Sequence, residues 1–143
     1  MKSIVTGGAG FIGSHLVDGL LDLGHEVVVL DNFSTGRKEN LDHVKGKIKL
    51  VKCDLSNKGN WIKEFKNVDW VFHLASLADI VPSIQNPECY FRSNVDATFY
   101  VLEAARHNNI KRFVYSASSS CYGIPEKYPT PEESDIQPQY PYA

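Results

Sequence analysis

Cysteine is scarce in this 143-residue sequence, and the few cysteines present form no recognisable set. Cys53, Cys89 and Cys121 are odd in number and lack the close spacing of zinc-binding or redox motifs. Their pattern argues against a disulfide framework and against a metal site. Reduced thiols fit a cytoplasmic protein best, so we expect that localisation.

Excess positive charge and long apolar runs are also missing. Fifteen Lys and Arg against seventeen Asp and Glu give a formal net charge of −2, without a cationic stripe, so we expect no nucleic-acid partner. No apolar run approaches the ~20 residues that span a bilayer, and the N-terminus is not typical of a signal peptide, so we expect no membrane partner. With 43% hydrophobic residues, the chain is long enough for one domain with a substantial core.

A glycine-rich segment near the N-terminus is the most informative motif that is present. Residues 6–13 read Thr-Gly-Gly-Ala-Gly-Phe-Ile-Gly and follow the apolar run 2–5, which is typical of a buried strand. Apolar residues then recur at helical spacing, namely Phe11, Ile12, Leu16, Leu20 and Leu23. Glycines between a strand and a helix let backbone amides and the positive end of the helix approach a pyrophosphate. The segment therefore predicts a dinucleotide site.

An acidic residue strengthens this prediction. Asp31 ends a second apolar run, 26–30, about 20 residues after the glycine segment, where a carboxylate can accept hydrogen bonds from the adenosine ribose. Its charge would repel a 2′-phosphate, so we expect NAD rather than NADP. Arg37 and Lys38 could bind that phosphate instead, although a solvated basic pair explains them as well.

Strand and helix patterns alternate along the whole chain. Strands are predicted from the runs 2–5, 26–30, 48–52, 68–74 and 112–117, and weak helices from 37–44 and 57–65. A long helix is predicted after Pro87, with an apolar face made of Phe91, Val95, Thr98, Phe99, Leu102 and Ala105. The alternation predicts an α/β fold with a doubly wound parallel sheet (Rossmann fold) in the order 3-2-1-4-5. Such a sheet normally has a sixth strand, so we interpret residues 1–143 as an incomplete NAD-binding domain without a C-terminal substrate domain.

Polar segments are expected beyond the carboxyl ends of the strands, where ligands bind in open α/β sheets. They are residues 74–76, 118–120 and 140–143. A Ser and Tyr pair beside a nicotinamide indicates hydride transfer with the tyrosine as general acid or base, its pKa lowered by nearby positive charge. A serine after a strand also commonly caps the next turn, so Ser118 has a structural interpretation too.

Together, these motifs resemble the N-terminal part of extended short-chain dehydrogenases/reductases of the NAD-dependent nucleotide-sugar epimerase type (UDP-glucose 4-epimerase-like). The matching segments are 6–13, 31–32, 54–55, 73–75, 94–95, 118–123 and 141–143. The resemblance implies epimerisation of a UDP-sugar. In that reaction NAD takes a hydride from sugar C4, the 4-keto intermediate rotates, and the hydride returns to its other face.

The resemblance also implies a role for individual residues. The implied cofactor contacts are Gly7, Gly10, Phe11, Ile12 and Gly13 for the pyrophosphate, Asp31 and Asn32 for the ribose, Asp54 and Leu55 for the adenine, and Leu74, Ala75 and Ser76 toward the nicotinamide. The implied catalytic residues are Ser118 and Tyr142, and Ser119 and Ser120 would place the substrate. No metal ligand is implied.

Related activities remain as alternatives. Similar dehydratases carry Asp-Glu where this chain has Ser119 and Ser120, and similar decarboxylases carry Glu at the second position; serines there favour epimerisation. The lysine of the family's Tyr-x-x-x-Lys would fall at position 146, so we expect the 143-residue chain by itself to be inactive. A non-catalytic dinucleotide-binding module is the alternative from another class. A homodimer through the helix that begins near Pro87 is also implied.

The remaining polar residues are interpreted as structural. His73 ends a predicted strand and is expected to pack rather than to titrate, and Asn94 is expected to support the site. The other histidines are expected at the surface; they are His15, His25, His43 and His107.

Overall fold

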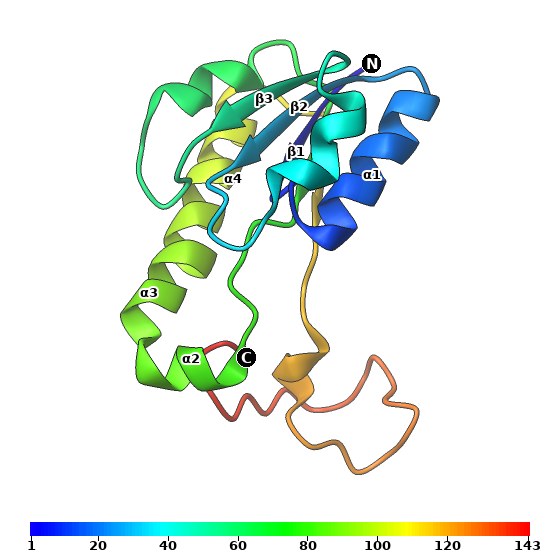
Figure 1. Ribbon diagram of the computed structural model, residues 1–143. Helices are drawn as coiled ribbons and strands as arrows, with labels where there is room; N and C mark the ends of the chain where they lie inside the picture. Colours follow the sequence, from blue (N-terminus) through cyan, green and yellow to red (C-terminus); the bar gives the residue numbers. More distant parts are fainter.

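Five parallel strands form one sheet in the order β3-β2-β1-β4-β5 (Figure 1). The structure, a computed structural model, describes residues 1–143. Its strands are β1 (Lys2–Thr6), β2 (Glu26–Asp31), β3 (Ile48–Lys52), β4 (Trp70–His73) and β5 (Arg112–Tyr115). This order and the parallel direction of the strands confirm the predicted fold class and strand order. Consecutive strands are joined by crossovers that pass over one face of the sheet or the other.

Helices cover both faces of the sheet. One face carries α1 (Phe11–Asp22) with the 3-10 helix η1 (Lys38–Val44), and the other carries α4 (Ala97–His107) with the 3-10 helix η2 (Asn60–Phe65). Side chains alternate between these layers, so Ile4, Val28 and Val71 pack toward α4 while Val5 and Val29 pack toward α1. Because both faces are covered, the central strands carry buried apolar side chains on both sides of the sheet.

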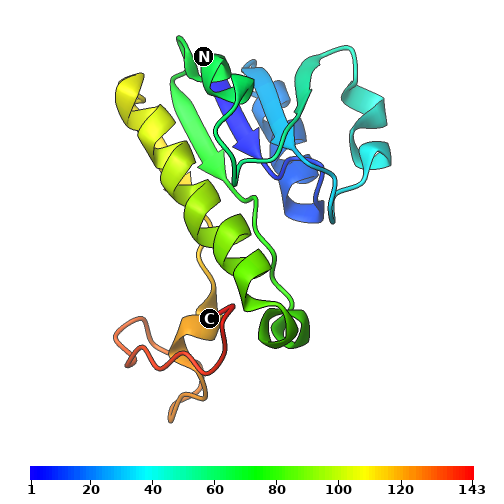
Figure 2. The same cartoon turned by 90° about the vertical axis from the view of Figure 1, so that its left-hand side faces the viewer.

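A long helical rod extends beyond the carboxyl edge of the sheet (Figure 2). It consists of α3 (Pro87–Phe91), a π-helical turn η3 (Arg92–Asp96) and α4, and it is preceded by the short helix α2 (Ile80–Gln85). The short helix was not predicted. Its Pro82 lies in the first turn, where the missing N–H of proline leaves no helical hydrogen bond unmade. None of the helices combines the length and the apolar character that spanning a bilayer requires.

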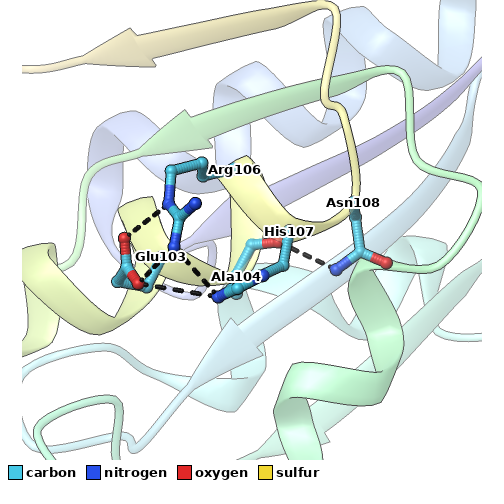
Figure 3. A network of polar contacts seen from close by, with 5 residues as sticks. All are labelled: Glu103, Ala104, Arg106, His107 and Asn108. Atoms are coloured by element: carbon cyan, nitrogen blue, oxygen red, sulfur yellow. Dashed lines mark hydrogen bonds and ion pairs between the residues drawn. The ribbon is translucent and has the colours of Figure 1, made fainter.

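Polar side chains cluster at the C-terminal end of α4 (Figure 3). The amide of Asn108 donates to the carbonyl of Ala104 at 2.8 Å and so satisfies one of the last free carbonyls of α4. Beside it, Glu103 pairs with Arg106 at 2.9 Å and with His107 at 3.6 Å. Hydrogen bonding from Arg106 lowers the pKa of Glu103. The side chains of Arg106 and His107 are exposed, so their ion pairs with Glu103 stabilise the helix end only weakly.

The apolar face predicted for the helix after Pro87 is wrong at four of its six positions, although Ala105 is buried as expected. The helix packs on the sheet through small residues, namely Ala97, Val101, Ala104 and Ala105. Predicted face members Phe91, Val95, Phe99 and Leu102 are exposed, Phe99 by 56%. The segment carries two apolar stripes, and the stripe of small side chains lets the helix approach the sheet closely. The larger side chains mark the surface that the implied homodimer would use, and that dimer stays a prediction.

Two further expectations are corrected by the structure. In α1 the buried apolar residues are Val17 and Leu20, whereas Phe11, Ile12 and Leu23 are exposed. His25 is buried, with its Nδ1 2.8 Å from Ser3 Oγ, and is not a surface residue. A partner 22 residues away in the sequence satisfies the ring, which local pattern cannot reveal.

Candidate functional site

The turn between β1 and α1 requires glycine at two positions, Gly7 and Gly13. Gly7 has a φ of +68°, which side chains disfavour, and a Cβ there would lie 2.8 Å from the Ala75 nitrogen. A Cβ on Gly13 would lie 2.2 Å from the carbonyl oxygen of Gly7. The first turn of α1 is therefore pressed directly against the end of β1.

Helix α1 begins with free amides. Its N-cap, Gly10, has no side chain to cap it, and the first intrahelical acceptor is the Gly10 carbonyl, which takes the Ser14 amide at 3.0 Å. The amides of Phe11, Ile12 and Gly13 have no acceptor within the chain. An uncapped helix start with three free N–H groups favours an anionic ligand, since the helix dipole adds positive potential there.

Asp31 connects the glycine turn to the end of β2. Its buried carboxylate accepts the Ala9 amide at 2.9 Å and the Phe33 amide at 2.7 Å. Phe33 has a φ of +60°, which is uncommon for an aromatic residue, and the hydrogen bond from its amide holds it there. Each carboxylate oxygen keeps a second lone pair, so Asp31 can support the loop and still accept from a ribose hydroxyl.

The loop that follows Asp31 closes on the glycine turn. The Arg37 amide and the Asn40 side chain both donate to the Ala9 carbonyl, at 3.0 and 2.8 Å. The Arg37 side chain is exposed, and the Lys38 ammonium lies 5.5 Å from the centre of the Phe33 ring. A cavity adjoins the glycine turn, and neither the Arg37 nor the Lys38 side chain lines it.

This cavity gathers nine of the predicted cofactor residues from four strand ends. They are Gly7, Gly10, Asp31, Asn32, Asp54, Leu55, Leu74, Ala75 and Ser76. Phe11, Ile12 and Gly13 do not line it, which agrees with a role for their amides rather than their side chains. Pattern reasoning missed further lining residues, among them Gly36, Cys53 and Leu77, because nothing in their local sequence sets them apart.

Two groups in the cavity, the thiol of Cys53 and the carboxyl of Asp54, have shifted pKa values. Burial raises the pKa of Cys53 to about 11, helped by the charges of Asp31 and Asp54, so the thiol stays protonated and unreactive near neutrality. Burial also opposes ionisation of Asp54, but hydrogen bonds from Ser56 and Asn57 outweigh it and lower the pKa of that carboxyl. Asp54 therefore presents a charged acceptor.

A second cavity of about 780 Å³ adjoins the first, and Leu74, Ala75 and Ser76 line both. It brings together Ser118 and Tyr142, the two residues with implied catalytic roles. Ser118 Oγ accepts the Ser120 amide at 3.1 Å and so caps the 3-10 helix η4 (Ser119–Tyr122). Ser119 and Ser120 do not line this cavity, and their substrate role stays a prediction.

The structural roles expected for His73 and Asn94 are confirmed. His73 is buried between Thr6 and Thr98, and burial lowers its pKa to about 4, so the ring is neutral. The Asn94 side chain makes two hydrogen bonds to the backbone of Leu77.

The fold and this geometry define a class of protein. A parallel sheet of this strand order, a glycine turn, free amides at the start of α1 and an acid at the end of β2 make a dinucleotide-binding α/β domain.

The chain belongs to the NAD dependent epimerase/dehydratase family, whose model matches residues 3–143. It is 41% identical over 148 residues to a UDP-glucose 4-epimerase from Mycolicibacterium smegmatis, covering 100% of this chain and 47% of that protein. The resemblance seen in the sequence is confirmed, and so is NAD as the cofactor of the family.

Solved structures agree with this assignment. A UDP-N-acetylglucosamine 4-epimerase from Methanobrevibacter ruminantium, in complex with UDP-N-acetylmuramic acid, has a TM-score of 0.91 and 39% identity, covering 99% of this chain and 45% of that chain. A UDP-glucose 4-epimerase from Bifidobacterium longum, in complex with NAD⁺ and UDP, has a TM-score of 0.90 and 31% identity, covering 99% and 44%. The chain thus spans less than half the length of these relatives.

Proposed function

We propose that this chain binds NAD and supplies the cofactor-binding part of a UDP-sugar 4-epimerase. The observation that carries the proposal is the shared position of two features. The glycine turn with its free amides and the Asp31 carboxylate meet at one cavity, at the carboxyl ends of the strands. Relatives that are UDP-sugar 4-epimerases support the activity, and the one from Bifidobacterium longum holds NAD⁺.

The residues present fit the cofactor. The amides of Phe11, Ile12 and Gly13 would hold the pyrophosphate, for which the uncapped helix has no competing acceptor. The ribose would lie at Asp31 and Asn32, and the adenine at Asp54 and Leu55. When bound, NAD supplies the reversible acceptor for the hydride of sugar C4.

Ser118 and Tyr142 would act on the sugar from the adjoining cavity. The tyrosine would take the proton of the C4 hydroxyl as hydride leaves, and would return it in the second half of the reaction. The Ser118 hydroxyl can still donate a hydrogen bond to that oxygen while its own oxygen accepts the Ser120 amide. The serines at 119 and 120 support epimerisation over elimination of water, because no carboxylate is present there to act as a base.

Replacing Asp31 tests the choice of cofactor. By isothermal titration calorimetry we expect the chain to bind NAD at least about tenfold more tightly than NADP, because the carboxylate repels a 2′-phosphate at short range. In Asp31→Ala both affinities should fall, since the Ala9 and Phe33 amides lose their acceptor. The preference should fall to less than about threefold, because the ratio cancels the loss that both ligands share.

Arg37→Ala is the matched control for this experiment. Its side chain is exposed and outside the cavity, so the preference for NAD should stay unchanged. Tighter binding of NADP by the unmodified chain would contradict the assignment of Asp31. No binding of either dinucleotide would contradict the proposed function.

Turnover is expected only from a protein that also carries the family's catalytic lysine. For the purified 143-residue chain we expect saturable NAD binding and no conversion of UDP-glucose in a coupled assay. Measurable turnover by the purified 143-residue chain would contradict this expectation. A reading frame that continues past Ala143 with a lysine at position 146 would favour the epimerase, and a stop codon there would favour the non-catalytic binding module.

A further inference from the structure

One backbone segment separates the two cavities. Residues 74–77 leave the end of β4; the first three line both cavities, and Leu77 lines the first. The segment also touches the glycine turn, because a Cβ on Gly7 would lie only 2.8 Å from the Ala75 nitrogen. A small displacement of this wall would change the space for ligands on both sides.

Hydrogen bonds hold the segment at both ends. At its start, the Leu74 and Ala75 amides each donate to Thr6 Oγ1 at 3.2 Å. At its end, the Leu77 amide donates to Asn94 Oδ1 at 2.8 Å, and Asn94 Nδ2 donates to the Leu77 carbonyl at 2.9 Å. The first anchor lies at the end of β1 and the second in the π-helical turn η3.

His73 connects the two anchors. Its Nδ1 lies 2.7 Å from Thr6 Oγ1, and its Nε2 lies 2.9 Å from Thr98 Oγ1. Thr98 in turn donates its hydroxyl proton to the carbonyl of Asn94, four residues earlier in the same rod. An unbroken line of hydrogen bonds therefore runs from Thr6 to Asn94.

The direction of each hydrogen bond follows from the partners. Thr6 Oγ1 already accepts two amides, so its proton goes to His73 Nδ1. The Asn94 carbonyl can only accept, so it takes the Thr98 proton and leaves Thr98 Oγ1 to accept from His73 Nε2. The geometry thus requires a neutral ring with its proton on Nε2, and every group in the line is satisfied.

We propose that Thr6, His73, Thr98 and Asn94 form a positioning network that fixes the 74–77 segment between the two cavities. Its effect on ligands rests on the proposed NAD site. None of the three side chains Thr6, His73 and Thr98 needs to contact the dinucleotide. The network keeps the 74–77 segment in one arrangement before the ligand arrives. NAD therefore binds without the entropic cost of ordering that segment.

Thr98→Val tests the network, because valine keeps the shape of threonine and removes its hydroxyl. By amide hydrogen exchange we expect about tenfold faster exchange at Ala75 and Leu77, the effect of about one buried hydrogen bond on local opening. Exchange in the centre of β2, at Val28, should stay unchanged. The dissociation constant for NAD should rise about tenfold. Thr98→Ser keeps the hydroxyl and should restore both values to within about twofold of the original protein.

A second readout needs no cofactor. In nitrogen-15 NMR of the ligand-free chain, His73 should show a single neutral tautomer with a slowly exchanging Nε2 proton, and Thr98→Val should lose that slow exchange. A proton on Nδ1, or equal acceleration at Val28 and Leu77, would overturn the network. Unchanged NAD affinity in Thr98→Val would overturn its effect on the ligand. If the unmodified chain binds no NAD, the proposed function fails, and the tautomer and exchange data still decide the network.

Discussion

Gly13→Ala is expected to abolish detectable NAD binding and to lower the free energy of unfolding by about 3 kcal/mol. The added Cβ would lie 2.2 Å from the Gly7 carbonyl oxygen and 2.7 Å from the Gly8 Cα. Both atoms belong to the backbone, so neither can turn away as a flexible side chain would. The glycine turn must open, and the free amides of α1 then lose their common direction.

Gly19→Ala in the same helix is the matched control. A Cβ at Gly19 would meet nothing within 4 Å. This variant should keep its NAD affinity and gain about 0.5–1 kcal/mol of stability, because alanine restricts the unfolded chain more than glycine does. Calorimetric titration with NAD and urea unfolding measure both effects. Binding by Gly13→Ala within about threefold of the original protein would contradict the assigned turn.

Lowering the pH from 7 to 4 is expected to reduce the free energy of unfolding by about 3 kcal/mol through His73 alone. Burial lowers the pKa of His73 from its ordinary value of 6.5 to about 4 in the folded protein. Between these two pKa values, His73 is mostly protonated in the unfolded chain and mostly neutral in the folded protein. Stability therefore falls as the pH falls from about 6.5 toward 4, and it is retained above that range.

His73→Gln isolates this contribution. Glutamine does not titrate and keeps an N–H donor for Thr98, so the slope of stability between pH 6.5 and 4 should flatten. His15→Gln, which changes an exposed histidine without an ion pair, should keep the original slope. Carboxyl groups with lowered pKa values, such as Asp54, lose their contribution only at lower pH. Equal slopes in His73→Gln and the original protein would contradict the neutral, buried ring. Urea unfolding at several pH values gives these slopes.

The parts of this protein that the sequence predicted correctly depend on short-range patterns. Strand β3 was predicted with its observed ends, and β1 and β2 within one residue. In β2 the continuous apolar run 27–30 leaves few alternatives to a buried parallel strand. The Gly7 and Gly13 positions were predicted because their requirement for glycine is set by the chain's own turn. Asp31 was predicted from its spacing to that turn, and the structure adds its two bonds to backbone amides.

The sequence by itself therefore determined the order of the strands, the glycine turn and the acid that faces it. Tertiary structure decided which stripe of α4 packs on the sheet, since only contact with the sheet distinguishes Ala104 from Leu102. It also decided the network around His73, whose partners lie 67 and 25 residues away in the sequence. Local periodicity records which side chains are apolar, but the packing of distant segments determines which of them meet and where each proton lies.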